Sequence, residues 1–174
     1  MNRLHVYTGD GKGKTTAAMG LALRSLGHGQ RVLVAQFMKN GNSGELIALA
    51  SFPCARVLLA PPIGDFTFRM DSAQKARARA EQTAFAEKLA DLIGQMKPNT
   101  VILDEMGAAL ECGMLDEDTS RRALDAALEV GETVVTGYSV PGWLCARADY
   151  VSRICAVRHP FETEGLPARK GVEW

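Results

Sequence analysis

Short apolar runs alternate with longer amphipathic stretches along most of the chain. The first run, residues 4–7, is followed by a glycine-rich turn and then by apolar positions at helical spacing over residues 14–26. A second run, residues 31–38, is rich in Val and Leu and bounded by glycines, which is typical of a strand buried on both faces of a parallel sheet. The chain therefore opens as strand, loop, helix and strand.

The same alternation continues to the C-terminal region. Further strands are expected at residues 55–59, 100–103, 133–136 and 150–157. Further helices are expected at residues 72–96 and 118–129. Loops are expected at residues 40–44 and 60–71, and Gly and Pro residues indicate a surface tail beyond Val157. This pattern predicts a single α/β domain over residues 1–174, with a mainly parallel central sheet flanked by helices.

The size and composition of the chain fit one globular domain. A chain of 174 residues is long enough to bury a core without disulfides, and 47% hydrophobic with 23% charged residues is ordinary for such a domain. The 20 basic residues balance the 20 acidic residues, so the protein has no overall field to attract nucleic acid or an anionic membrane. We expect neither partner, and any anion site must be local.

The cysteines and the N-terminal sequence favour a cytoplasmic protein with reduced thiols. Cys54, Cys112, Cys145 and Cys155 are widely spaced and form no C-x-x-C pair. The sequence reaches Gly9 without the apolar segment of a signal peptide, and no run approaches the roughly 20 apolar residues that cross a bilayer. We therefore expect a cytoplasmic location.

A segment rich in Gly, Lys and Thr lies where the first strand ends and the first helix begins. Its residues are Thr8, Gly9, Asp10, Gly11, Lys12, Gly13, Lys14, Thr15 and Thr16. Glycines expose backbone N–H groups, the helix N-terminus adds positive potential, a Lys reaches phosphate oxygens, and a Thr hydroxyl can bind Mg²⁺. We predict that this segment binds a nucleoside triphosphate, with Lys14 catalytic and Thr15 a metal ligand. The alternative is a glycine-rich turn that contains lysines by chance.

The spacing of this phosphate loop differs from the standard one. The pattern G-x-x-x-x-G-K-[ST] would place a glycine at position 8, but Thr8 stands there and Gly9 follows, so the loop is one residue shorter. A shorter ring of amides cannot wrap a β-phosphate in the usual way. We therefore expect the triphosphate to sit differently from that of an ordinary kinase.

Two carboxylates follow the apolar run at residues 101–103. Asp104 and Glu105 lie at the expected C-terminal end of that strand, which is the edge where open α/β sheets place their ligands. Carboxylates at this edge can hold a divalent cation directly or through water. We predict a site for Mg²⁺ or Mn²⁺ formed by Thr15, Asp104 and Glu105. The alternative is an acidic pair that caps the next helix.

Several segments, taken in order, resemble the corrinoid adenosyltransferases of the CobA/CobO/BtuR type. The similar segments are TGDGKGKTT at 8–16, QFMK at 36–39, GE at 44–45, GDFTF at 64–68, LDE at 103–105, TG at 136–137, AD at 148–149, RHPF at 158–161 and GVEW at 171–174. Each is short, and the resemblance rests on their order and spacing over the chain.

This resemblance implies a RecA-like P-loop enzyme, usually a homodimer. In such an enzyme the Co(I) of cobalamin or of a corrinoid precursor attacks the 5′ carbon of ATP and displaces inorganic triphosphate. An electron-donating reductase or flavodoxin is an implied partner. The triphosphate is bound in reverse, and Lys14, the loop amides and Mg²⁺ would stabilise it as the leaving group. Because cobalt is the nucleophile, the chemistry needs mainly positioning and charge stabilisation.

The resemblance also assigns a role to two phenylalanines. Phe66 and Phe68 match an aromatic pair that closes the lower face of the corrin and excludes the axial ligand, which makes Co(II) easier to reduce. We therefore expect Phe66 and Phe68 to be catalytic together with Lys14, on one side of an extended segment. Many members have Trp where Phe68 stands. The alternative is that both rings pack the loop into the core.

Other positions depart from the common family pattern. Tyr138 stands where many members have Arg, and Arg158 stands where Lys is common. For His159, a structural hydrogen bond is favoured over a direct ligand contact. Many members carry an N-terminal extension over the corrinoid, whereas this sequence begins at the first strand, so a more open corrinoid pocket is expected.

Two other functions are compatible with the residues. A small-molecule kinase or NTPase would use the same loop, with Asp104 or Glu105 positioning the attacking group. A non-catalytic protein would bind ATP or a corrinoid as a sensor or carrier.

Overall fold

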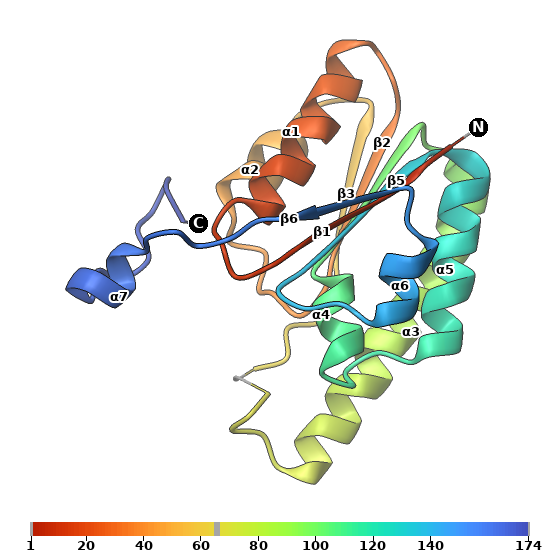
Figure 1. Cartoon of the computed structure of the whole chain (residues 1–174). Coiled ribbons are helices and arrows are strands. Elements are labelled where there is room, and N and C mark those ends of the chain that lie inside the picture. Colours follow the sequence, from red (N-terminus) through yellow and green to blue (C-terminus); the bar gives the residue numbers. More distant parts are fainter. Residues whose placement is uncertain (1, 65–66, 174) are drawn as a thin grey trace.

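A single parallel sheet forms the centre of the protein. The computed structural model describes residues 2–64 and 67–173, in which six strands pair in the order β3-β2-β4-β5-β1-β6 (Figure 1). Every pairing is parallel. The strands are β1 (Leu4–Thr8), β2 (Val32–Gln36), β3 (Ala55–Leu59), β4 (Thr100–Asp104), β5 (Glu132–Gly137) and β6 (Tyr150–Arg153).

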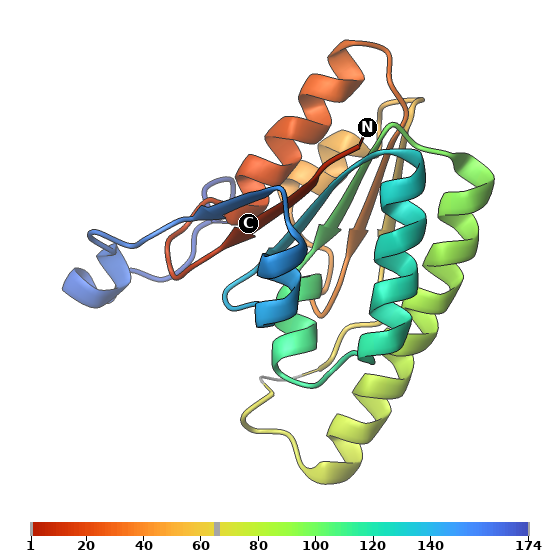
Figure 2. The same cartoon turned by 45° about the vertical axis from the view of Figure 1, so that its right-hand side comes forward.

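Helices cover both faces of this sheet. On one face lie α1 (Lys14–Gly27) and α2 (Gly44–Leu49). On the other face lie α3 (Ser72–Met96), α4 (Met106–Glu111), α5 (Glu117–Val130) and α6 (Gly142–Arg147). Figure 2 shows the last helix, α7 (Pro160–Glu164), on a C-terminal segment that extends away from the sheet. Among the described residues, no helix combines the length and the apolar character needed to cross a membrane.

The strand residues alternate between two hydrophobic clusters, one on each face. Val32 and Val34 of β2 pack with α1 and α2, whereas Leu33 and Ala35 pack with the cluster that includes α3 and α5. All four side chains are fully buried. Because both faces of β2 are covered, its sequence is apolar at every one of these positions, as expected for a strand inside a parallel sheet.

The predicted α/β class is confirmed, including its RecA-like arrangement with a parallel sheet flanked by helices. The bounds expected for β3 and α3 are those observed, and the other expected strands and helices are found with small shifts at their ends. The start of α3 is well defined because the Asp71 side chain accepts from the Gln74 N–H, while Gln74 reaches back to the Asp71 N–H.

Two expectations about the elements are wrong. The strand expected at residues 150–157 ends at Arg153, beyond which the chain leaves the sheet edge. Four short helices, α2, α4, α6 and α7, were not expected. The segment beyond Val157 lies at the surface as expected, but it contains α7, which has no buried residue. Each of the four helices has only five or six residues, which is too short to display a helical period.

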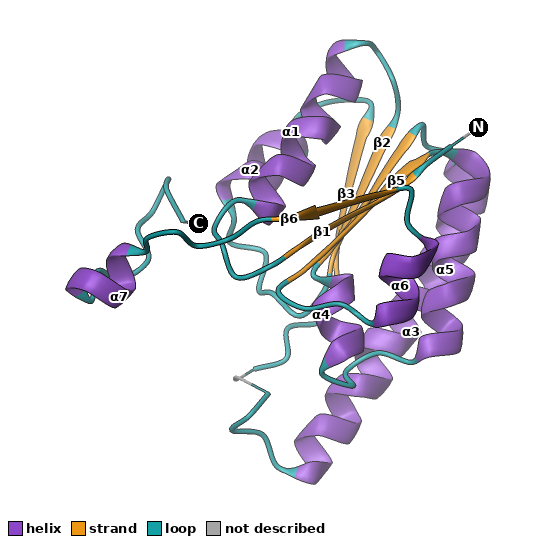
Figure 3. Ribbon diagram, viewed as in Figure 1, coloured by secondary structure: helices purple, strands orange, loops and turns teal. Residues whose placement is uncertain are grey.

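The topology gathers four loops at one edge of the sheet (Figure 3). Because the strands are parallel, the C-terminal ends of β1, β2, β4 and β5 lie on the same side. The phosphate loop follows β1, Lys39 follows β2, Glu105 follows β4 and Tyr138 follows β5. Ligands of open α/β sheets bind at this edge, so the fold brings the predicted site residues together.

Candidate functional site

The phosphate loop is packed closely against the segment that follows β6. Gly9 and Gly13 have φ angles of 111° and 116°, in the region that favours glycine. A Cβ on Gly9 would collide with the Ile154 carbonyl oxygen, and a Cβ on Gly11 would lie 2.7 Å from the Cys155 carbonyl carbon. The glycines are therefore needed for both the backbone conformation and the close approach of this segment.

Two backbone N–H groups of the phosphate loop are already hydrogen-bonded within the protein. The Gly9 N–H donates to the Tyr138 carbonyl at 3.0 Å, and the Gly11 N–H donates to the Ile154 carbonyl at 2.9 Å. Within the described ranges, no side chain caps α1, whose N-cap residue is Gly13. The N–H groups of the first turn of α1 therefore remain the principal backbone donors for an anion.

Lys14 lies folded over the phosphate loop. Its Nζ donates to the carbonyl oxygens of Gly9 and Gly11 at 2.7 and 2.8 Å. Burial lowers the pKa of Lys14, the positive charge of Lys39 lowers it further, and the Glu105 carboxylate opposes both effects. The ammonium of Lys14 thus lies over the mouth of the loop, where a phosphate would replace neutral carbonyls with charged oxygens.

Asp104 is the buried centre of the site. Its side chain is 0% exposed and accepts hydrogen bonds from the Thr15 hydroxyl at 2.8 Å, the Thr136 hydroxyl at 2.7 Å and the Gln36 Nε2 at 2.8 Å. A carboxylate so deeply buried requires this network of donors. Thr15 and Asp104, two of the three predicted metal ligands, are therefore in direct contact.

The third predicted ligand, Glu105, has an unusual backbone. Its φ is 60°, and it is the N-cap residue of α4, although no described contact shows its side chain capping that helix. Its carboxylate instead lies 2.9 Å from the Lys39 Nζ. The alternative in which the acidic pair caps the next helix is therefore wrong. A left-handed backbone at a residue other than glycine is often found at functional sites.

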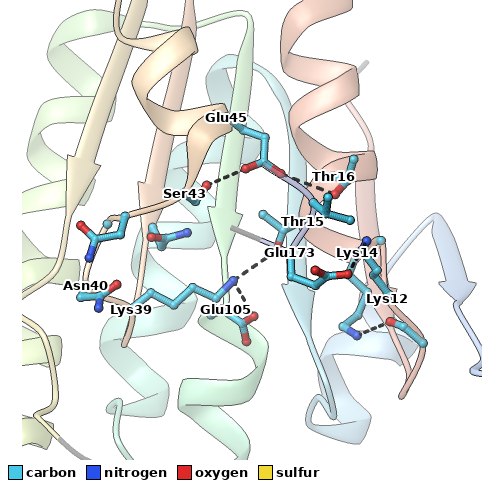
Figure 4. Close-up of a pocket in the computed structure, with 16 residues that line it drawn as sticks. Lys12, Lys14, Thr15, Thr16, Lys39, Asn40, Ser43, Glu45, Glu105 and Glu173 are labelled. Carbon is cyan, nitrogen blue, oxygen red and sulfur yellow. Dashed lines mark hydrogen bonds and ion pairs between the residues drawn. The ribbon is translucent and has the colours of Figure 1, made fainter. Parts of the chain in front are cut away.

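The Lys39 ammonium contacts all three predicted metal ligands, although Lys39 was not predicted as a site residue. Its Nζ lies 3.2 Å from the Thr15 Oγ1 and 2.9 Å from the Glu105 Oε1 (Figure 4). It also lies 3.3 Å from the Asp104 Oδ2. Burial opposes its charged form, but the charges of Asp104 and then Glu105 outweigh this effect and raise the pKa of Lys39. Lys39 therefore carries its positive charge beside the acidic pair.

These residues lie along a cleft of about 530 Å³ at the edge of the sheet. The cleft is lined by residues 11–16 and Glu105, together with residues 39–43, Gln36, Glu45 and the C-terminal Val172 and Glu173. Thr8, Gly9 and Asp10 do not line it, although they were predicted with the loop. The Thr8 hydroxyl donates to the Tyr138 carbonyl at 3.2 Å, and an Asp10 oxygen accepts from the Ala156 N–H at 3.4 Å.

The cleft also contains polar residues that the sequence analysis did not assign. Glu45 accepts from the Ser43 hydroxyl at 2.8 Å and from Thr16, a predicted loop residue, at 3.5 Å. Glu173 lies 3.1 Å from the Lys12 Nζ. Lys39 and Glu45 both lie in segments that resemble the family, at residues 36–39 and 44–45. That resemblance is the sequence feature that could have identified them as site residues.

A second cavity, of about 620 Å³, adjoins the cleft. It shares Lys39, Asn40 and Glu105 with the cleft and is otherwise lined by Met38, Thr67 and residues 62–64. Phe66 lies outside the described residues. Phe68 is 76% exposed, and the Arg69 guanidinium lies 5.5 Å from its ring centroid. The alternative in which both phenylalanines pack into the core is therefore wrong for Phe68.

Two other residues singled out in the sequence have clear positions. The His159 Nδ1 accepts from the Phe161 N–H at 3.2 Å and caps α7, which is the structural role that was favoured. Tyr138 is 65% exposed, and its ring centroid lies 5.9 Å from the Lys14 Nζ. Tyr138 therefore borders the phosphate loop through its ring and its backbone carbonyl.

Comparison with known proteins identifies the family of the chain. The chain is 35% identical over 173 residues to a corrinoid adenosyltransferase of Pseudomonas aeruginosa, covering 98% of this chain and 83% of that protein. It is 32% identical over 172 residues to the corrinoid adenosyltransferase CobA of Salmonella typhimurium, covering 97% and 84%. The Escherichia coli K12 corrinoid adenosyltransferase is 29% identical over 175 residues, covering 97% and 84%. The profile of the ATP:corrinoid adenosyltransferases BtuR/CobO/CobP matches residues 1–174, so the chain belongs to this family.

Proposed function

We propose that the protein transfers the 5′-deoxyadenosyl group of ATP to the Co(I) of a corrinoid and releases inorganic triphosphate. The cobalt electron pair forms the bond to C5′, while the bond between C5′ and the triphosphate oxygen breaks and its electron pair leaves with the triphosphate. This is the activity that the family name describes. The cobalt, and not a side chain, is the nucleophile.

The observation that carries this proposal is the junction of the two cavities at Lys39 and Glu105. One cavity is lined by the phosphate loop and suits a polyanion. The other is lined by Met38, Pro62 and Ile63 and by the loop that contains the phenylalanines, which suits the face of a large, partly apolar ring. A reaction between a nucleotide and a corrinoid needs two such sites side by side.

The residues of the cleft would stabilise the leaving triphosphate. Lys14 and Lys12 supply positive charge, and the first turn of α1 supplies N–H donors at the positive end of its dipole. Lys14 is held at the loop before the reaction, because its Nζ is bonded to the Gly9 and Gly11 carbonyls. Charge that develops on the triphosphate would meet an ammonium that already lies beside the loop.

The residues present also fit a divalent cation. Thr15, Asp104 and Glu105 offer the hard oxygen donors that Mg²⁺ or Mn²⁺ prefers. The buried Gln36 Oε1, which has no hydrogen-bond partner within the described ranges, lies on a side chain that lines the same cleft. When bound, Mg²⁺ would neutralise charge on the triphosphate. The described residues contain no cluster of three or more His, Cys, Asp or Glu side chains suited to a metal, so triphosphate oxygens would complete the ligand set.

The loop over residues 60–71 would act on the corrinoid. Phe66 and Phe68 are proposed to close the lower face of the ring and exclude the axial ligand. The 76% exposure of Phe68 supports this role, because its ring reaches the surface directly after Thr67, which lines the second cavity.

The proposal also covers the oligomeric state, the electron donor and the cellular location. We expect a homodimer in the cytoplasm that accepts electrons through a reductase or flavodoxin. The edge strand β6 supports self-association, since Tyr150 and Val151 are 54% and 50% exposed. All four cysteines lie in the described part of the chain and are free thiols, which supports a reducing compartment.

The direct test is an anaerobic assay with chemically reduced cob(I)alamin, Mg²⁺ and ATP. We expect the absorbance change to adenosylcobalamin, with intact triphosphate as the phosphate product. ADP or free phosphate without a corrinoid product would contradict the proposal and favour a kinase or NTPase. Tight corrinoid binding without turnover would contradict it in favour of a non-catalytic binding protein.

A further inference from the structure

The Lys39 side chain lies where a divalent cation would be expected. Its Nζ is within 3.3 Å of one oxygen of each predicted metal ligand, Thr15, Asp104 and Glu105. Figure 4 shows this side chain reaching across the cleft toward Thr15 and Glu105. A buried carboxylate such as Asp104 is costly to keep charged without a cation nearby. The ammonium provides that cation within the protein.

The backbone that carries Lys39 is held firmly. The Lys39 N–H donates to the Phe37 carbonyl at 2.7 Å, which closes a γ-turn around Met38, whose φ is 60°. A γ-turn with a positive φ at its centre is rare and strained. The buried Gln82 of α3 fixes the turn, because its Oε1 accepts from the Met38 N–H at 3.1 Å.

The Lys39 side chain, in contrast, can move without disturbing this turn. Lysine carries a compact ammonium on a flexible stem of four carbons, and the side chain is 39% exposed. Lys39 also lines the cleft that contains the phosphate loop. A polyphosphate in the cleft therefore offers new oxygens to the same ammonium.

We infer that Lys39 is a displaceable counter-ion of the Asp104–Glu105 pair, and that it makes the binding of a divalent cation and of a polyphosphate depend on each other. The inference rests on the proposed function, since it uses the same triphosphate cleft. A metal ion alone must expel the ammonium from the carboxylates. A polyphosphate that binds the ammonium removes this competition, and by reciprocity the metal strengthens polyphosphate binding. Lys39 is thus a positioning residue that favours the joint entry of metal and triphosphate.

The test measures binding of Mn²⁺ alone to the metal-free full chain, from the electron paramagnetic resonance signal of free Mn²⁺. Lys39→Met is expected to bind Mn²⁺ about tenfold more tightly than the wild type, because the competing cation is gone. The same variant should bind inorganic tripolyphosphate more weakly when EDTA removes all metal. Equal or weaker Mn²⁺ binding by Lys39→Met would overturn the inference.

Lys12→Met is the matched control. Lys12 lines the same cleft, but its ion pair is with Glu173 and not with the acidic pair. The variant removes the same charge, so it should weaken tripolyphosphate binding while changing Mn²⁺ affinity by less than about twofold, since exposed charges are screened. An equal gain of Mn²⁺ affinity in both variants would mean that net charge, and not displacement of Lys39, sets the affinity.

A measurement on the wild-type chain follows the Lys39 side chain directly, and it needs a variant only to assign the signal. In protein labelled with ¹³C-lysine, the Lys39 ¹³Cε signal is assigned by its loss in Lys39→Arg. We expect this signal to shift when Mg²⁺ and tripolyphosphate are added together, and a signal that stays in place would overturn the inference. Neither assay contains adenosine or a corrinoid, so these failures are distinct from failure to form adenosylcobalamin, which would refute the proposed function.

Discussion

The Thr136 hydroxyl connects β5 to the acidic end of β4 through two hydrogen bonds. It donates to Asp104 at 2.7 Å and accepts from the Glu105 N–H at 2.9 Å. Thr136 and Asp104 are both 0% exposed, so the Asp104 carboxylate cannot bind water in place of the hydroxyl. Thr136→Val should therefore lower the free energy of unfolding by about 2 to 3 kcal/mol, as expected when buried polar groups lose their partner. Denaturation with urea measures this change.

Thr136→Ser separates the hydroxyl from the methyl group. Serine keeps both hydrogen bonds and removes one buried methyl, which should lower the free energy of unfolding by only about 1 kcal/mol. If serine and valine destabilise the protein equally, the hydroxyl does not have the role described for it.

Lys14→Ala should reduce adenosylcobalamin formation by about 10²- to 10³-fold. The reason is that the variant removes a preorganised positive charge from the site of the leaving triphosphate. The rate with saturating ATP and cob(I)alamin is the measurement. Lys88→Ala, which removes a lysine from an exposed position on α3, is the control and should retain the wild-type rate. Near-normal turnover by Lys14→Ala would refute the assignment of the phosphate loop.

Phe68→Ala should affect cobalamin more than cobinamide. Cobalamin carries its own lower axial ligand, which the aromatic pair is proposed to exclude, whereas cobinamide lacks that base. Because Phe68 is 76% exposed, the substitution should change the free energy of unfolding by less than about 0.5 kcal/mol. Adenosylation rates with the two corrinoids, measured beside a urea titration, check both statements. Equal losses on the two substrates would remove the axial-ligand argument.

The fold was predictable because its elements carry strong local signals. The sequence of α3 shows a helical pattern over 25 residues and begins with a capping box at Asp71 and Gln74. In β2, buried apolar residues on both faces indicated a central strand. The helices of five or six residues, such as α4, had no such signal, because they follow from tertiary packing and not from a period.

Candidate site residues could be predicted only where each lies in a short, recognisable sequence motif. Thr15, Asp104 and Glu105 belong to short motifs with a known chemistry. The position of Lys39 depends on β2 lying beside β4, although β3 and α3 intervene in the sequence. The strained turn at Met38 and the buried Gln82 that holds it are likewise tertiary features. These relationships required the structure.

The C-terminal Glu173 gives a final prediction about access to the cleft. Its carboxylate pairs with Lys12 at 3.1 Å, so a polyphosphate must compete with it for that lysine. Glu173→Gln should therefore strengthen tripolyphosphate binding by about two- to fivefold, the range of an exposed ion pair. Isothermal titration calorimetry measures this affinity, and Glu164→Gln on α7 removes an equal charge from the same segment as a control.

The pH dependence of this effect follows from the state of Glu173. Hydrogen bonding from Arg169 is the main cause that lowers the pKa of Glu173 to about 2, and Lys12 contributes to the same shift. The carboxylate therefore stays ionised as the pH falls from 8 to about 4, where a Glu with the ordinary pKa of 4.5 would be mostly protonated. The ratio of the affinities of Glu173→Gln and wild type should thus be constant from about pH 4 to pH 8. A ratio that approaches one within this range would mean that Glu173 becomes protonated there and that its pairing with Arg169 and Lys12 is not maintained in solution.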